Sequence, residues 1–229
     1  SEMCIRDRDE LFIKLNSYKF RSKVEILNLS NEFVVAVLSR EKFLTLENSK
    51  DVLGYTTKFR EDPIYLDPRH KDLGARLITN LEKLHLSLKL LELKSSNLDE
   101  YYSVSNKLGI PQINTDKLQN NLFGIECNLN ELNGIDFKKG CYVGQENTAR
   151  IKLKDKLSKR LFPVEVIEGD LSKDNIIHHE NTELGKVLIN NKFPFAIVKF
   201  KDKNFKFEKI FKCGSASVKI KKPYWFKFD

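Results

Sequence analysis

Residues 139–146 read Lys-Gly-Cys-Tyr-Val-Gly-Gln-Glu and hold one cysteine, Cys141, between two glycines. The stretch that follows, from 145 to about 151, is predicted to be a helix. Gly140 and Gly144 permit tight turns with positive φ. A cysteine just before a helix lies near unpaired backbone N–H groups and the positive end of the helix dipole. This setting favours the reactive thiolate and suits an anionic or carbonyl ligand, so the segment predicts a functional site.

A lone cysteine is more often a small buried hydrophobe than a nucleophile, and that interpretation stays open for Cys141. The whole octapeptide, however, resembles the signature of the YgfZ family, folate-binding relatives of the glycine-cleavage T-protein (aminomethyltransferase). In that family the signature is followed shortly by Ala-Arg, and here Ala149 and Arg150 stand at the same spacing. Further matches extend the resemblance over nearly everything from Leu11 onward; they are residues 67–69, 73–74, 108–111, 126, 128–129, 134–137, 159–161, 163–164 and 184–187.

The resemblance implies an α+β fold. T-protein-like (GcvT-like) α+β domains would surround a central cavity and be followed by a small C-terminal antiparallel β-barrel. The predicted boundaries are 9–154 for the folate-binding-type region and 155–229 for the barrel. Family members also carry an N-terminal portion ahead of the segment that resembles residues 11–26, and residues 1–8 resemble nothing in the family. We therefore expect that the chain lacks this portion, which would contribute to the cavity.

Residue patterns agree with a mixed first part and a strand-rich second part. In the first part, apolar periodicity predicts helices from Asp9, over 80–91 and from Asn97, the last ending at Gly109. Runs rich in Val and Leu predict strands, and residues 128–133 predict a short helical turn. The predicted strands are 24–27 and 33–38 in the first part, and 161–167, 184–189, 193–200, 205–211 and 216–221 in the second. Core positions of the barrel are predicted at Phe205, Phe207, Ile197 and Ile210.

The resemblance assigns roles to the signature residues. Cys141 would be the reactive or redox-sensitive thiol, and Tyr142 would stack on a ligand or pack beneath it. Gln145 and Glu146 offer an amide and a carboxylate, while Lys139 and Arg150 offer cations that could meet a glutamyl tail. Glu146 and Arg150 also have the spacing of a helical ion pair worth only about 0.3–0.5 kcal/mol, so a structural role is equally open.

Three functions compete. The favoured one is a folate-binding accessory protein that supports assembly or repair of iron–sulfur enzymes, including tRNA-modifying ones, with tetrahydrofolate as ligand and with client enzymes or assembly factors as partners. The second is a folate-dependent aminomethyltransferase, for which Glu126 is the candidate acid. Whether the chain is an enzyme therefore stays open. The third is an RNA-binding module acting through the C-terminal part.

Charge gives the third function limited support. Basic and acidic residues balance over 1–150, so the net charge of +8 lies in 151–229, where lysines cluster at 152–160 and 199–206. Such a patch attracts polyanions, although lysines alternating with aromatic residues are also typical of a half-buried strand.

Other functional classes have little support in the sequence. The four cysteines are widely spaced without a C-x-x-C pair, which favours reduced thiols and no metal site. The adjacent histidines 178 and 179 would point to opposite faces of a strand. The longest apolar run, 33–38, is too short to span a bilayer. We expect a cytoplasmic protein, with a mitochondrial matrix relative as the alternative.

Overall fold

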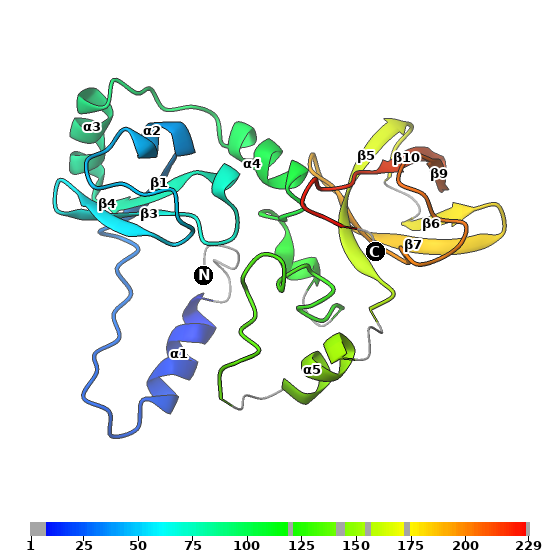
Figure 1. Ribbon diagram of the computed structural model, residues 1–229, viewed down its shortest axis with the longest axis horizontal. Coiled ribbons are helices and arrows are strands. Elements are labelled where there is room, and N and C mark those ends of the chain that lie inside the picture. Colours follow the sequence, from blue (N-terminus) through cyan, green and yellow to red (C-terminus); the bar gives the residue numbers. More distant parts are fainter. Residues whose placement is uncertain (1–7, 119–120, 141–144, 154–156, 172–174, 228–229) are drawn as a thin grey trace. The chain divides into compact units, whose positions relative to one another are not determined.

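The structure is a computed structural model that describes residues 8–118, 121–140, 145–153, 157–171 and 175–227 (Figure 1). It divides into two compact units, one up to Asn97 and one from Leu98. Each unit has its own sheet and its own buried core. The predicted domain boundary at 154/155 lies outside the described residues and stays a prediction.

The first unit is built on a four-stranded antiparallel sheet in the order β1-β4-β3-β2. Its strands are β1 (Val34–Leu38), β2 (Thr56–Phe59), β3 (Asp62–Leu66) and β4 (Ala75–Thr79). Its helices are α1 (Arg8–Tyr18), α2 (Arg40–Leu44), the 3-10 helix η1 (Lys71–Leu73) and α3 (Leu81–Leu90). Phe43 of α2 is fully buried with Ile64, Leu66 and Leu77 of the sheet, so α2 covers one sheet face.

Local sequence explains most of these elements. The helix predicted over 80–91 is α3, and the Asn80 side chain caps it by accepting a hydrogen bond from the Lys83 N–H at 2.8 Å. The predicted helix at Asp9 and strand at 33–38 are α1 and β1. The strand predicted over 24–27 is wrong. Val24 and Leu27 are exposed there, so the segment has no buried face to hold a strand in register.

The second unit begins with α4 (Leu98–Lys107), the helix predicted from Asn97. It ends as predicted at Gly109, whose φ of +71° is left-handed. The Trp225 indole N–H donates to the Leu108 carbonyl at 2.9 Å, which ties the helix end to the C-terminal segment. The 3-10 helix η2 (Thr115–Leu118) and α5 (Gln145–Leu153) follow.

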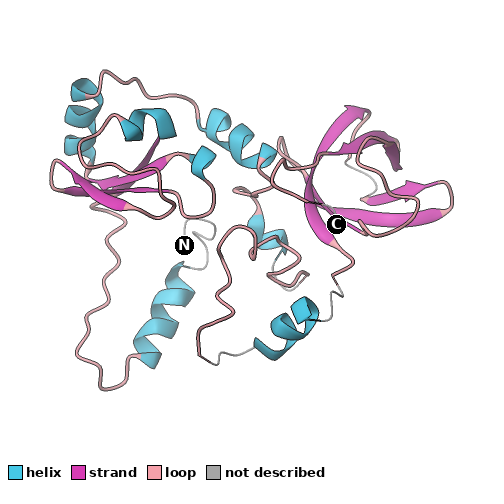
Figure 2. Ribbon diagram, viewed as in Figure 1, coloured by secondary structure: helices cyan, strands magenta, loops and turns pink. Residues whose placement is uncertain are grey.

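Six antiparallel strands of the second unit close a barrel in the order β10-β5-β8-β7-β6-β9 (Figure 2). They are β5 (Arg160–Glu168), β6 (Ile176–His179), β7 (Thr182–Ile189), β8 (Phe195–Val198), β9 (Ile210–Cys213) and β10 (Ala216–Ile220). Aromatic rings fill much of the interior, where the Phe162 centroid lies 5.1 Å from Phe207 and 5.0 Å from Phe226. Each buried ring stabilises the fold by about 1.5–3 kcal/mol. The predicted C-terminal barrel is confirmed.

Two details of the predicted barrel are wrong. Residues 205–209 form an irregular loop with a turn at 207–208, so the strand predicted over 205–211 is reduced to β9 from Ile210. Ile210 is 57% exposed instead of buried. The cause is the alternation of β9, which points Phe211 and Cys213 inward and leaves Ile210 outside. Phe205 is buried as expected, but from a loop.

We predict that Gly185→Ala destabilises the barrel. A Cβ at this position in β7 would lie 2.3 Å from the Ile197 carbonyl oxygen and 3.0 Å from the Val198 Cα, both backbone atoms of β8. Forcing those strands apart should lower the free energy of unfolding by about 1–3 kcal/mol, measured by urea denaturation. Gly140→Ala is the matched control, because apart from its two chain neighbours no described residue has an atom within 4 Å of its Cβ position. Equal stability of the two variants would contradict the close packing of β7 against β8.

We also predict that acid weakens the first unit through Asp51. Its carboxylate accepts hydrogen bonds from Arg40 (2.8 and 2.6 Å) and from Lys71 (2.8 Å), and these lower its pKa well below the ordinary 3.8. A lowered pKa contributes stability that is present above the unfolded-state pKa and is lost as pH falls through the folded-state pKa.

Amide hydrogen exchange in β1 and β4 measures this effect. Protection should fall between about pH 5 and pH 2 in the wild type and fall less in Asp51→Asn, which should already be weaker at neutral pH. Parallel pH profiles for both proteins would show that Asp51 does not carry the effect.

Candidate functional site

The predicted signature residues are described only in part. Cys141, Tyr142 and Gly144 lie outside the described residues, as does the side chain of Gln145. The predicted helix is confirmed as α5, which starts at Gln145. Lys139, Gly140, Glu146 and Arg150 are exposed, and within the described part of the chain no ion pair joins Glu146 to Arg150. Exposed residues therefore precede Cys141 in the sequence, at Lys139 and Gly140, and follow it, at Glu146 and Arg150.

Glu126 has a local hydrogen-bond partner. Its carboxylate accepts a hydrogen bond from the Phe123 N–H at 2.9 Å, which closes the turn before it. Its backbone carbonyl accepts another from the Leu161 N–H at 2.9 Å, at the start of β5. The neighbouring Cys127 thiol is largely buried, and desolvation, reinforced by the Glu126 charge, raises its pKa to about 11. Cys127 is therefore a neutral thiol at physiological pH.

Asn128 joins the loop before the signature to the barrel. Its side chain is fully buried, and its φ of +63° lies in the left-handed region that Asn tolerates. The amide donates to the Leu161 carbonyl at 2.8 Å and accepts from Arg160 Nη1 at 3.0 Å. Arg160 Nη2 also forms an ion pair of 2.6 Å with Glu131. The start of β5 is thereby fixed to residues 126–131.

A hollow of about 570 Å³ lies beside this junction, inside the second unit. We call it the Arg160 hollow. Its lining comes from the loop before the signature, the last turn of α5, the first residue of β5 with the segment before it, the turn after β8 and the C-terminal segment. The lining residues are Ile125, Asn130, Ile151, Lys152, Leu157, Arg160, Phe200, Lys201, Phe226 and Lys227. Its volume falls in the range of about 300–1,000 Å³ typical of small-molecule sites.

The lining combines positive charge with aromatic surface. The Arg160 guanidinium carbon lies 5.3 Å from the centroid of Phe226 and 5.8 Å from that of Phe200, both of which are buried. Lys152 Nζ lies 3.6 Å from the Phe137 ring centroid. Arg160 Nε is buried, and among the described residues it has no hydrogen-bond partner. A buried unsatisfied donor costs about 1–3 kcal/mol, so an acceptor at this position would be stabilised.

Sequence reasoning placed Arg160, Lys152 and Lys201 in basic clusters and did not bring them together. The clusters at 152–160 and 199–206 are far apart in sequence, and strand pairing between β5 and β8 unites them. The sequence did contain one signal for this part of the hollow. Lysine and phenylalanine alternate near Phe200, and this pattern places a cation next to a buried ring. Phe226 carried no such signal, since it lies in an irregular C-terminal segment.

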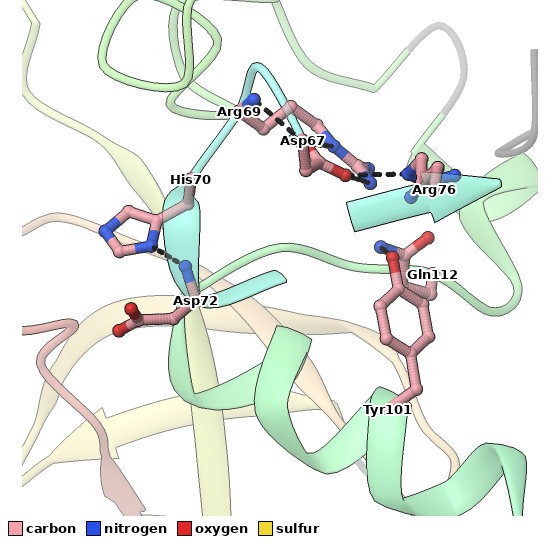
Figure 3. Close-up of polar contacts among 7 residues, drawn as sticks. All are labelled: Asp67, Arg69, His70, Asp72, Arg76, Tyr101 and Gln112. Carbon is pink, nitrogen blue, oxygen red and sulfur yellow. Dashed lines mark hydrogen bonds and ion pairs between the residues drawn. The ribbon is translucent and has the colours of Figure 1, made fainter. Parts of the chain in front are cut away.

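A second polar cluster occupies the first unit, where the sequence reads Asp-Pro-Arg at 67–69. Asp67 is fully buried and accepts hydrogen bonds from Arg69 and Arg76 at 2.8 to 3.1 Å (Figure 3). Nearby, His70 Nδ1 accepts from the Asp72 N–H at 3.1 Å, and desolvation lowers the His70 pKa. Because Asp67 is paired on both carboxylate oxygens, the cluster is well suited to holding the 67–76 turn together.

Neither a metal cluster nor a membrane span is found in the described part of the chain. Among residues 8–118, 121–140, 145–153, 157–171 and 175–227, no group of three or more His, Cys, Asp or Glu side chains could hold a metal ion. Within the same ranges, none of the helices combines the length and apolarity needed to cross a bilayer.

No family model matches the chain. Among curated proteins it is 30% identical over 170 residues to an iron-sulfur cluster assembly factor IBA57 homolog, mitochondrial, from Dictyostelium discoideum, covering 74% of this chain and 41% of that protein. It is 33% identical over 164 residues to mitochondrial IBA57 of Mus musculus, covering 71% of this chain and 43% of that protein. The chain thus spans less than half the length of these relatives.

Among solved structures, the chain resembles the glycine cleavage system aminomethyltransferase T from Bartonella henselae. The TM-score is 0.63 at 10% sequence identity, covering 96% of this chain and 66% of that one. At this identity the likeness shows the fold alone, and it confirms the predicted T-protein-like α+β class with its antiparallel barrel. The chain is thus an aminomethyltransferase-type fold with sequence similarity to IBA57 iron–sulfur assembly factors.

Proposed function

We propose that this protein is an accessory factor in the assembly or repair of iron–sulfur enzymes, as a member of the YgfZ family to which its signature points. The observation that carries the proposal is its similarity, over about three quarters of its length, to proteins named as iron–sulfur cluster assembly factors. The chain also contains, at residues 139–146, the whole octapeptide that resembles the signature of the YgfZ family. Its partners would be iron–sulfur client enzymes, tRNA-modifying ones among them, or other assembly factors.

Cys141 is the proposed reactive thiol. It precedes α5, where the helix dipole favours a thiolate. Two other cysteines of the chain have unreactive environments. Cys213 is fully buried in the barrel, and burial raises the pKa of Cys127 to about 11. The surroundings of Cys127 and Cys213, the two cysteines among the described residues, therefore fit structural thiols and leave the reactive role to Cys141 in this proposal.

A tetrahydrofolate-type ligand is the cofactor that the resemblance implies. The Arg160 hollow fits its anionic end, because it joins buried phenylalanine rings to cationic groups. Arg160, Lys152 and Lys201 would hold the glutamyl carboxylates, and Phe200 with Phe226 would contact the aromatic body. When bound, tetrahydrofolate would supply amine nitrogens that accept a one-carbon unit.

The aminomethyltransferase alternative is weaker for this chain. It needs an acid free to act at the folate nitrogen, and Glu126 was the candidate. The Glu126 carboxylate instead holds the Phe123 N–H in its own turn. We therefore do not assign a transfer reaction to the chain.

The RNA-binding alternative is also weaker. Several barrel lysines face acidic partners, as in Lys221–Glu165 at 2.6 Å and Lys219–Glu208 at 3.0 Å. Such pairs reduce the charge available to a phosphate backbone.

For location, the curated relatives are named as mitochondrial, so the cytoplasm and the mitochondrial matrix both remain compatible with the proposal.

We predict that Cys141→Ala abolishes rescue of iron–sulfur enzymes in cells lacking the protein. The measurement is the activity of a cluster-dependent enzyme, normalised to a cluster-independent one and to the amount of variant protein. Cys127→Ala is the matched control and should rescue as well as the wild type, because its thiol is neutral at physiological pH. Undiminished rescue by Cys141→Ala would refute the role of the thiol.

We also predict that the thiols differ in alkylation rate. With Cys4→Ser as background, iodoacetamide at neutral pH should modify Cys141 much faster than Cys127, whose thiol loses its proton only near pH 11. Peptide mass spectrometry over a pH series measures both rates in one sample. Equal rates at neutral pH would mean that Cys141 has no lowered pKa.

A further inference from the structure

We propose that the free edge of strand β1 is the surface through which two copies of this chain form a symmetric dimer. The β1 strands of the two copies would pair antiparallel and join the two four-stranded sheets into one continuous sheet. The occupant of the edge is thus a second copy of the chain. The inference goes beyond the proposed function, because neither the signature nor the Arg160 hollow enters its argument.

Strand β1 lies at one edge of the sheet of the first unit and pairs there with β4. This pairing continues over all five residues without a register shift, so no bulge bends the strand away from a neighbour. In the described part of the chain, the backbone of residues 34–38 forms no hydrogen bond with a loop or turn. The outward N–H and C=O groups of β1 therefore offer a template for another strand.

The side chains of β1 lack the features that keep an edge strand unpaired. Such features are a lysine, a proline or a very short strand. The opposite edge, β2, has them, because it is four residues long and carries Lys58, whose side chain is 70% exposed. Strand β1 reads Val-Val-Ala-Val-Leu and exposes Val35 (46%) and Val37 (41%). An uncharged apolar edge of this kind is stabilised when a second strand covers it.

The sequence of β1 is complementary to itself in one antiparallel register. When a two-fold axis passes through Ala36, Val35 lies opposite Val37 of the second copy. In the same register Val34 lies opposite Leu38 of the second copy. Apolar side chains then face apolar side chains on both faces of the joined sheet, and such cross-strand pairs are the unit that stabilises a sheet.

Charge complementarity favours the same register. The strand is bounded by Glu32 and Arg40, which stand four residues before and four residues after Ala36. The axis through Ala36 therefore places Glu32 of each copy opposite Arg40 of the other. Glu32 is exposed, and Asp51 binds Arg40 through Nε and Nη2, which leaves Nη1 for a further carboxylate. Moving the axis by one residue in either direction would place one of these charges opposite an apolar residue of the strand.

The turn before β1 adds apolar surface to the edge. Phe33 donates its N–H to the Leu29 carbonyl at 3.1 Å, which keeps both residues next to the start of the strand, and both side chains are exposed. In the proposed register Phe33 of one copy lies diagonally across from Val37 of the other, within reach of an aromatic ring. A five-residue strand with this turn is smaller than the roughly 800 Å² per partner of a standard interface, so we expect dissociation in the micromolar range.

Sedimentation velocity of the 229-residue chain tests the inference. Between about 1 and 100 μM, the average mass should rise from that of a 26.7 kDa monomer toward twice that value. Amide hydrogen exchange should show that protection of residues 34–38 rises with protein concentration. A chain that stays monomeric over this range would overturn the inference, as would protection of residues 24–28 in the monomer, since the chain would then cover its own edge.

Two double variants test the register. Val35→Lys with Val37→Lys places like charges opposite each other at two sites and should weaken dimerisation about tenfold or more. Val35→Lys with Val37→Glu places a lysine opposite a glutamate at the same two sites, so it should dimerise about tenfold more tightly than the double lysine variant. Val166→Lys, an exposed change on a strand of the closed barrel, is the matched control and should leave the dissociation constant within about twofold.

Unfolding midpoints recorded for each variant show whether the sheet itself is intact. Undiminished dimerisation of the double lysine variant would overturn the inference, and equal affinity of the two double variants would overturn the register. Because Cys141 has no part in these measurements, the rescue experiment can fail while the dimer is confirmed, and the dimer can fail while rescue succeeds.

Discussion

The second unit depends on how the start of β5 is attached to the loop that precedes the signature. Leu161 donates its N–H to the Glu126 carbonyl, and its own carbonyl accepts from the Asn128 side chain. Leu161 is also fully buried with Ile189 and Phe195 in a small cluster. The first residues of the barrel are thus bonded to the loop through backbone and side-chain amide hydrogen bonds. Arg160, one residue earlier, is held by its own contacts to Asn128 and Glu131 in the same loop.

This attachment explains why Asn is found at 128. A side chain there must accept from a guanidinium, donate to a backbone carbonyl and tolerate a left-handed φ. Asp could accept but not donate, and Gln would bring an extra methylene and a poorer fit to that φ. The buried amide then leaves no polar atom of its own unpaired, whereas Arg160 Nε beside it has no partner.

The sequence predicted the elements whose signals are local. Asn80 and Gly109 mark helix ends through capping and a left-handed φ, and both helices lie where those residues place them. The strand at 205–211 was wrong because alternation of Lys and Phe is also produced by a loop that inserts Phe205 into a core. For the site, a helix was predicted directly after the two glycines, and α5 starts there at Gln145. The hollow was not predicted, because it depends on the pairing of β5 with β8, which brings together residues as distant in sequence as Arg160 and Val198.

Charged side chains are arranged differently in the two units. In the first unit they pair with one another and stabilise the fold, whereas in the second unit several of them line a hollow that could bind a ligand. In the first unit the buried carboxylate of Asp67 is matched by two guanidinium groups, which leaves little capacity for an external ion. In the Arg160 hollow the described lining contributes four cations, Lys152, Arg160, Lys201 and Lys227, and no Asp or Glu side chain. The last turn of α5 contributes Ile151 and Lys152 to that hollow, and its first turn directly follows the segment with Cys141. The hollow therefore lies at the opposite end of α5 from the residues that directly follow the segment with Cys141 in the sequence.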